Sequence, residues 1–378
     1  MVREEENSRV GTVLTDLVHE GVAVWLDGVN RQSLEDGSLR RRAMNACVSG
    51  AVLSLRELAR EVQEGTAYQD QIDLLGERGV SAEEAVRALH SYDARWACDV
   101  LRPVFASTGE VDGWVSAELD PRLADDARAS IAAARALALG VNRPNLLVKV
   151  PSTVSGLEVL SGCVAEGIGV DTGPLYSVQR YNEVVEAYFD GLERAFAAGR
   201  SPGGSSVASF SAARLEDAVD AQLDEAAEDA AAVLRGRSAP ALAQAAYTVY
   251  EDWLGTERWR QLRARGARPQ RLVWLSATAP GPEAASVRRV EELVAWGTIH
   301  ALPEPTLSAV DRLGRLRGDT LSGESDASDA VLSALRQQGI NMEQLAEDLT
   351  ATELREGVHD QLELIGTLQA RWSGRPHR

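Results

Sequence analysis

The stretch NLLVKVPST, from Asn145 to Thr153, contains the only lysine of the 378-residue chain. The chain has 39 lysine and arginine residues, and all of them except Lys149 are arginine. Lys149 lies inside an apolar run, Leu146 to Val150, that predicts a buried strand, where an unpaired ammonium group is costly. Such a lysine requires either a buried ion pair or a chemical role.

Seven further segments share this pattern of a short apolar run followed by apolar residues at helical spacing. With NLLVKVPST, the eight predicted strands cover residues 22–28, 45–50, 115–121, 145–153, 168–177, 206–211, 271–278 and 298–303. Alternation of buried strands with helices predicts a parallel sheet, and eight strand–helix units predict an α/β fold of the closed (β/α)8 barrel (TIM barrel) type. An open doubly wound sheet is the alternative.

Three segments extend beyond a minimal barrel. Helical patterns predict an N-terminal helix at about residues 9–19, an inserted helical segment at about residues 238–267 and a helical C-terminal tail. Neither a fixed-period repeat nor a low-complexity tract divides the chain. We therefore predict a single barrel domain over residues 1–378.

The composition limits the classes of partner and cofactor. A net charge of -18 and a pI of about 4.8 oppose binding to nucleic acid. The polar, acidic N-terminus and the absence of an apolar run of about 18 to 20 residues predict a cytoplasmic protein without a membrane segment. Three widely spaced cysteines, five histidines without metal-ligand spacing and the absence of nucleotide-binding motifs predict neither a metal nor a cofactor.

Polar residues near the ends of the predicted strands are the candidates for an active site, because barrel enzymes place their chemistry at the carboxyl ends of the strands. They are Asp27, Ser49, Glu118 with Asp120, Lys149, Asp171, Ser209 and Ser276. A desolvated lysine has a lowered pKa and attacks ketones or aldehydes to form a Schiff base, while nearby carboxylates move the protons. A structural ion pair of Lys149 with Glu118 or Asp27 is the alternative.

Several segments resemble the transaldolase family. WLDGVNR (25–31) is similar to its first strand, RWACDVLRPVFASTGEVDGWVSAELDPRLADD (95–126) to its third strand and the approach to it, and NRPNLLVKVPSTVSGLEVL to the fourth strand, which bears the Schiff-base lysine. SVASFSAAR, RLVWLSAT and the segment 301–321 follow in the family's order. The similarity extends from about residue 10 to about residue 370 and is greatest to the longer bacterial members.

This resemblance implies a (β/α)8 barrel that transfers a dihydroxyacetone unit between sugar phosphates without a metal or cofactor. It implies that Lys149 is the nucleophile, that Asp27 deprotonates the C4 hydroxyl, and that Glu118 works through a water molecule in Schiff-base formation. Ser209 and Arg214, in SFSAAR, correspond to the family's sugar and phosphate contacts.

The chain also departs from the family pattern at substrate-binding positions. In ACVSGA, Ser49 is matched to the asparagine that holds the ketol hydroxyls; Asp171 replaces another asparagine; Gly173 replaces the threonine that positions a catalytic water; and Pro280 stands near an expected phosphate-binding cation. Loss of a cation and gain of a carboxylate weaken the binding of a phosphate dianion. We therefore expect altered substrate specificity.

Three functional hypotheses follow. The first is a class I Schiff-base transferase that acts on a sugar or sugar phosphate, as a monomer or homodimer. The second is a diverged aldolase or lyase of specialised metabolism, which releases its fragment to water. The third is a non-catalytic relative that binds a ligand or partner, and it leaves the single lysine unexplained.

Overall fold

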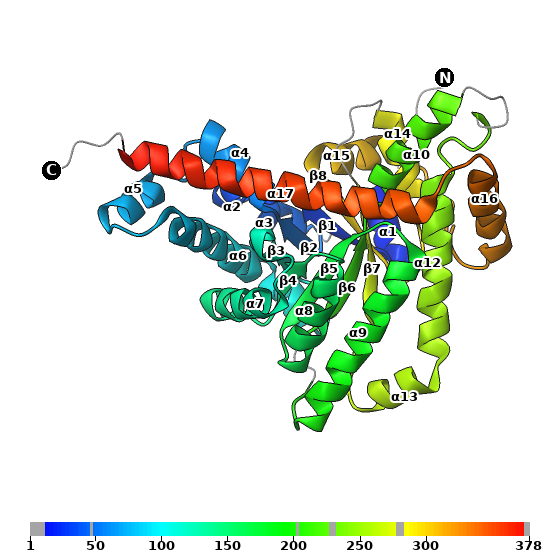
Figure 1. The fold of residues 1–378 in the computed structure, drawn as a ribbon, viewed down its shortest axis with the longest axis horizontal. Helices are drawn as coiled ribbons and strands as arrows, with labels where there is room; N and C mark the ends of the chain where they lie inside the picture. Colours follow the sequence, from blue (N-terminus) through cyan, green and yellow to red (C-terminus); the bar gives the residue numbers. More distant parts are fainter. Residues whose placement is uncertain (1–11, 46–47, 202–203, 227–231, 277–282, 374–378) are drawn as a thin grey trace, which may run out of the picture.

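The computed structural model describes residues 12–45, 48–201, 204–226, 232–276 and 283–373. Eight parallel strands form a closed barrel in sequence order, as Figure 1 shows. Strand β8 pairs with β1, with Trp25 opposite Ala301, so the sheet has no free edge. The strands are β1 (Ala23–Asp27), β2 (Gly50–Leu53), β3 (Trp114–Glu118), β4 (Leu146–Val150), β5 (Gly169–Leu175), β6 (Ser206–Phe210), β7 (Arg271–Leu275) and β8 (Ile299–Pro303). The barrel prediction is confirmed.

The predicted helical extensions are confirmed as well. The N-terminal helix is α1 (Val13–His19), the insertion contains α12 (Ser238–Gly255) and α13 (Glu257–Ala264), and the C-terminal part contains α16 (Ser325–Gln337) and α17 (Met342–Ser373). The other helices are α2 (Arg31–Glu35), α3 (Ser38–Met44), α4 (Leu55–Glu64), α5 (Gln69–Glu77), α6 (Ala82–Ser107), η1 (Pro121–Leu123), α7 (Ala127–Val141), α8 (Val154–Ala165), α9 (Val178–Ala197), α10 (Ala212–Ala226), α14 (Glu283–Glu291) and α15 (Glu304–Leu313).

Side-chain caps fix the places where helices begin after the strands. Ser54 accepts a hydrogen bond from the amide of Glu57 at the start of α4, and Thr153 accepts one from the amide of Gly156 at the start of α8. Each cap satisfies an amide that lacks a partner within its helix. The caps therefore place the N-termini of α4 and α8 directly after the carboxyl ends of β2 and β4.

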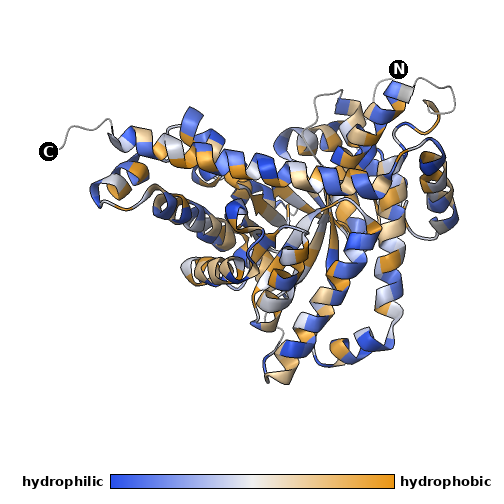
Figure 2. Cartoon of the chain, viewed as in Figure 1, coloured by the Kyte–Doolittle hydropathy of each residue, from blue (hydrophilic) through white to orange (hydrophobic). Residues whose placement is uncertain are grey.

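Apolar side chains fill the lower part of the barrel. Trp25 and Trp274 are fully buried, so these tryptophans belong to the core rather than to a binding surface. Gly50, opposite Trp25 in the β1–β2 register, leaves room for the indole ring, since a Cβ atom there would collide with it. Figure 2 shows the apolar strands at the centre and polar residues on the outer faces of the helices.

A buried ion pair ties the segment after β1 to α6. The guanidinium of Arg31 bonds to the carboxylate of Asp93 at 2.5 Å and lies between the rings of Tyr68 and Tyr92, 4.5 and 4.6 Å from their centroids. The Tyr68 hydroxyl donates to Asp93 at 2.7 Å. Because a buried charge needs partners, this network holds the chain just beyond Asp27 in one place.

The second strand begins later than the sequence predicted. The prediction was residues 45–50, whereas β2 is Gly50–Leu53 and Asn45 ends α3. The four residues of β2 are all buried between neighbouring strands, whereas Asn45 is exposed. Burial on both faces, which is typical of a parallel strand, therefore selects the apolar GAVL segment.

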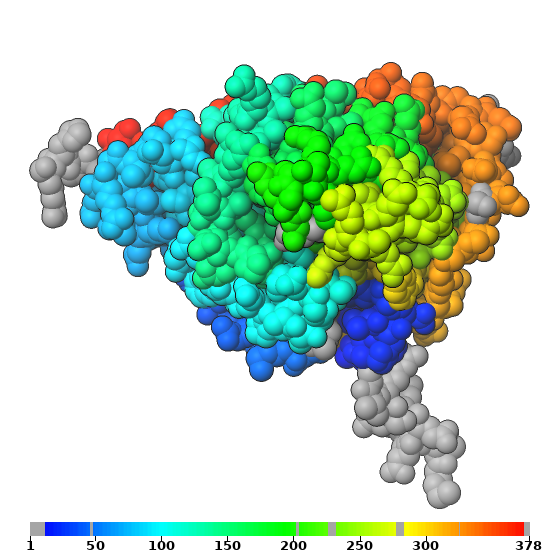
Figure 3. Space-filling view, turned by 90° about the horizontal axis from the view of Figure 1, so that it is seen from below, coloured from blue at the N-terminus to red at the C-terminus, as the bar shows by residue number. Residues whose placement is uncertain are grey.

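The long helix α17 crosses the barrel mouth, as the orange-to-red ribbon in Figure 1 shows. It packs on α4, α6, α10, η1 and β5. Leu364, Ile365 and Leu368 of α17 join a buried apolar cluster with α4, α5 and α6. Figure 3 shows the opposite face, where α9 and α13 form much of the surface and α17 is seen only at the edge. Helix α17, the roof helix, therefore covers one end of the barrel.

Within the described residues, no helix combines the length and the apolar character needed to cross a membrane.

Candidate active site

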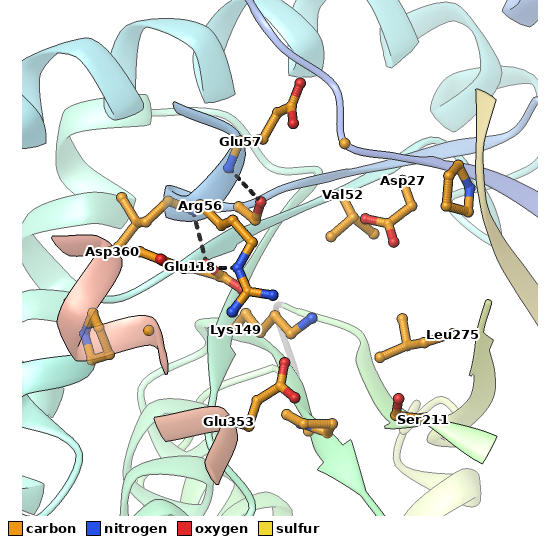
Figure 4. Close-up of a pocket in the computed structure, with 18 of the residues that line it drawn as sticks. Asp27, Val52, Arg56, Glu57, Glu118, Lys149, Ser211, Leu275, Glu353 and Asp360 are labelled. Carbon is orange, nitrogen blue, oxygen red and sulfur yellow. Dashed lines mark hydrogen bonds and ion pairs between the residues drawn. The ribbon is translucent and has the colours of Figure 1, made fainter. Parts of the chain in front are cut away.

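A cavity of about 1140 Å³ lies at the carboxyl ends of the strands, beneath α17. Lys149, Asp27 and Glu118 line it together, as the sequence predicted, and Figure 4 shows all three around the same space. Helix α17 contributes Glu353 and Asp360 to the lining. The cavity thus combines one amine with carboxylates from the strands and from the roof.

Lys149 is the centre of this group. It is partly buried near the end of β4, and its register neighbours are Glu118 on β3 and Asp171 on β5. Burial by itself lowers the pKa of Lys149, but the carboxylates of Asp171, Glu118 and Asp27 outweigh burial, so that its pKa is raised. The lowering of the pKa expected from burial alone is thus opposed by the negative charges of the carboxylates around the amine.

Asp27 is the last residue of β1 and lies at the cavity wall. Burial raises its pKa to about 6, although the charge of Lys149 acts in the opposite direction. A carboxyl group with such a pKa can both accept and return a proton near neutral pH. Its position and its pKa fit an acid/base group.

Glu118 is the last residue of β3, and the start of α4 holds it in place. Its Oε2 accepts a hydrogen bond from the amide of Leu55 at 2.9 Å, next to the capping residue Ser54. Burial raises the pKa of Glu118, while Lys149 and the Leu55 amide lower it. Glu118 therefore lies beside the amine as a second partly buried carboxyl group of the cavity.

Asp171 and Ser209 lie inside the barrel and do not line the cavity. Asp171 is 1% exposed. Its carboxylate accepts hydrogen bonds from Ser209 at 2.5 Å and from Ser116 at 2.6 Å. The substrate contacts predicted for Asp171 and Ser209 are thus not supported by their placement, because the hydroxyl and the carboxylate are bonded to one another.

Ser49 is far from the cavity, which corrects the prediction that it ends the second strand. Its amide donates to the carbonyl of Val24, and its carbonyl accepts from the amide of Gly113, both at the amino-terminal ends of their strands. The residue that follows β2 and lines the cavity is Ser54. The late start of β2 moves this position by five residues.

The structure also accounts for Gly173. A Cβ atom at this position would lie 2.5 Å from the carbonyl oxygen of Ser209, too close for any side chain without a backbone shift. Gly173 lines the cavity, so the absence of a side chain leaves space there. The threonine of the family pattern does not fit in this backbone.

The remaining strand-end candidates are Asp120 and Ser276. Asp120 caps η1, forms an ion pair with Arg122 at 2.6 Å and lines the cavity. Ser276 also lines the cavity, although it is largely buried. Pro280 lies outside the described residues.

Arg214, the predicted phosphate contact, lines the cavity and is bonded to the roof. Its guanidinium contacts Glu353 at 2.5 Å and Glu356 at 2.8 Å. Sequence reasoning missed Arg56, whose guanidinium contacts Asp360 at 2.7 Å. The acidic residues of α17 recur at helical spacing in the sequence, which places them on one face of the helix. No sequence pattern indicates that this face pairs with Arg56.

Comparison with known proteins agrees with this geometry. Residues 24–368 match the family model described as "Transaldolase/Fructose-6-phosphate aldolase". A protein named transaldolase from Thermobifida fusca (strain YX) is 44% identical over 341 residues, which is 90% of this chain and 93% of the relative. A transaldolase from Acidothermus cellulolyticus is 44% identical over 346 residues, with 91% and 92% covered. A transaldolase from Mycolicibacterium smegmatis is 38% identical over 330 residues, with 87% and 89% covered. The chain belongs to the transaldolase/fructose-6-phosphate aldolase family.

Proposed function

We propose that this protein transfers a three-carbon, dihydroxyacetone-type ketol unit from a ketose donor to an aldehyde acceptor through a Schiff base on Lys149. Family membership makes the chain a transaldolase-like transferase of the class I aldolase type. The observation that carries the assignment of Lys149 is its position: the only lysine of the chain lies in the cavity, in register with Glu118 on the neighbouring strand.

The proposed reaction begins when the Nζ atom of Lys149 attacks the ketone carbon of the donor. The carbinolamine loses water to give an iminium ion, and Glu118 supplies and removes the protons through a water molecule. Asp27 then takes the proton of the C4 hydroxyl as the C3–C4 bond breaks, and the bonding electrons move into the iminium to form an enamine. The aldehyde fragment leaves, an acceptor aldehyde enters, and the reverse steps release the product.

The first step requires an uncharged amine. The carboxylates raise the pKa of Lys149, and burial raises the pKa values of Asp27 and Glu118. All three pKa values are raised, that of Lys149 by the neighbouring negative charges and those of Asp27 and Glu118 by burial, so the amine and the carboxylates compete for protons within one cluster. We propose that a carboxylate of this cluster receives the lysine proton when the donor carbonyl arrives and displaces water from the cavity.

The remaining residues have supporting roles in this proposal. Arg214 and Ser54 line the cavity, and Arg214 is paired there with Glu353. In this proposal Asp171 acts on Lys149 through its negative charge rather than through contact with the substrate, and Ser209 holds the Asp171 carboxylate by a hydrogen bond. Family membership implies sugar phosphates as the general substrate class, and we propose a cytoplasmic monomer or homodimer.

Borohydride trapping tests the proposed function. The protein is incubated with ketoses, ketose phosphates and simple ketols, reduced, and measured by intact mass. The single lysine leaves two amine sites, Lys149 and the N-terminus, and peptide mapping separates them. An adduct of the three-carbon fragment on Lys149 supports the proposal, whereas its absence across the panel in folded protein favours the non-catalytic hypothesis. Added aldehyde acceptors then distinguish transfer from release to water.

A further inference from the structure

We propose that Glu353 of the roof helix occupies the anion-binding part of the cavity from within, so that the enzyme selects a ketol donor without a phosphate group. This inference rests on the proposed Schiff-base transfer and names the class of its donor. It makes Glu353 a specificity-determining residue, contributed by a helix outside the barrel.

Glu353 is bonded to one arginine that lines the cavity and to one buried tyrosine. Its Oε2 atom accepts hydrogen bonds from the guanidinium of Arg214 at 2.5 Å and from the hydroxyl of Tyr176 at 3.1 Å. Figure 4 shows the Glu353 carboxylate directed toward the space next to Lys149. A guanidinium is a typical ligand of a phosphate oxygen, and here a carboxylate of the same chain holds the guanidinium that lines the cavity.

The contacts continue across the cavity mouth. Glu356 accepts from Arg214 at 2.8 Å and from Arg56 at 3.1 Å, and Arg56 also bonds to Asp360 at 2.7 Å. Helix α17 therefore contributes three carboxylates to two arginines on opposite sides, from α10 and from α4. The positive charge of both arginines is balanced before any substrate enters.

Each of the other arginines among the described residues that line the cavity is also paired with a carboxylate. The remaining lining arginines are Arg42, paired with Glu304, and Arg60, paired with Glu57. The lining contains nine acidic residues, namely Asp27, Asp36, Glu57, Glu118, Asp120, Asp217, Glu304, Glu353 and Asp360, against Lys149 and four arginines. The local field therefore opposes a dianion.

A phosphate dianion at Arg214 would have to break the bond to Glu353 and would then lie against two carboxylates. A neutral polyol is not repelled by these carboxylates. Its hydroxyls can donate hydrogen bonds to Glu353 while Arg214 remains paired. The same carboxylate thus penalises a phosphate ester and contributes to the binding of a free sugar. This is selection by repulsion of the competing ligand.

A Glu353→Gln variant tests the inference. The trapping rates of D-fructose and D-fructose 6-phosphate are compared in wild type and variant, so that differences in the donors' own chemistry cancel. We expect the variant to raise the rate for the phosphate ester relative to the free sugar by about tenfold, the value of one charge-assisted contact. The matched control is Glu347→Gln, an exposed position of α17 outside the cavity lining, which should leave the ratio unchanged.

Inorganic phosphate gives a second readout that does not depend on Schiff-base chemistry. Its binding is measured by calorimetry with wild type, Glu353→Gln and Glu353→Ala, after circular dichroism has shown that each is folded. Weak binding by wild type and tighter binding by either variant supports the inference. Equal binding by all three, or a wild type that traps the phosphate ester more readily than either variant does, overturns it. If neither sugar gives an adduct, the proposed function fails while the phosphate measurement still decides this inference.

Discussion

Lys149 and Asp171 are register partners on β4 and β5, and Asp171 is held by two serine hydroxyls inside the barrel. The carboxylate is therefore a fixed negative charge next to the amine. It is the foremost of the carboxylates that raise the pKa of Lys149 against the lowering effect of burial.

Replacing Asp171 by asparagine should therefore lower the pKa of Lys149. An amide keeps hydrogen-bonding capacity toward Ser116 and Ser209 but removes the charge. The measurement is the pH dependence of Lys149 modification by an amine-selective reagent, read by peptide mass. A midpoint that shifts to lower pH confirms the effect, and an unchanged midpoint would show that Glu118 and Asp27 dominate.

Lys149→Arg should abolish borohydride trapping and reduce transfer by on the order of a thousandfold or more. Arginine keeps the positive charge for Asp171 and Glu118, but its guanidinium stays protonated and cannot attack a carbonyl. Thermal unfolding serves as the control for folding. Full function of this variant would favour the structural ion pair and the non-catalytic hypothesis.

Asp27→Asn should retain Schiff-base formation and lose cleavage of the donor. General-base groups contribute about 10²- to 10⁴-fold, so turnover should fall in that range while the borohydride adduct with intact donor persists. The measured quantities are the mass of the adduct and the rate of aldehyde release. An adduct of the three-carbon fragment formed at the wild-type rate would assign cleavage to another residue.

The pH profile of the wild type should show an acid limb from Asp27. Burial raises the pKa of Asp27 to about 6, and only the carboxylate can accept the hydroxyl proton. The value of kcat/KM should therefore rise with pH through about 6 and fall as the pH drops below it. The Asp27→Asn variant should lack this limb, and its persistence there would point to Glu118.

Glu118→Gln should slow Schiff-base formation more than it slows cleavage. Glutamine can still accept the hydrogen bond of the Leu55 amide, so the start of α4 keeps its position. It cannot transfer a proton, and the trapping rate should fall by at least about 10²-fold. Stopped-flow quenching with borohydride measures this step alone; a normal trapping rate would remove Glu118 from the proposed mechanism.

Arg31→Ala should destabilise the fold by about 3 to 5 kcal/mol, because it leaves the buried carboxylate of Asp93 without its charge partner. The matched control is Arg41→Ala. Arg41 forms an exposed pair with Asp36 at 4.0 Å, and its loss should cost less than about 1 kcal/mol. Denaturant unfolding of both variants provides the comparison, and equal costs would contradict the assigned burial.

The sequence by itself determined the barrel and the catalytic candidates Lys149, Asp27 and Glu118. Buried strands carry a local signal, since apolar runs and flanking helical patterns follow from a few neighbouring residues. The ends of such strands meet at one edge of a barrel, so polar residues there are brought together by topology. The second strand shows the limit of this signal, because a shift of five residues moved Ser49 to the opposite end of the barrel.

Only the tertiary structure decided the electrostatics and the roof of the site. A pKa depends on charges summed through space, and the sign of the shift at Lys149 follows from carboxylates on other strands. Arg214 and Glu353 are 139 residues apart in the chain, and Arg56 and Asp360 are 304 apart. No local pattern encodes which face of α17 packs over the barrel, because long-range packing fixes it. The proposed donor class therefore depends on the placement of this helix over the cavity, which the sequence does not encode locally.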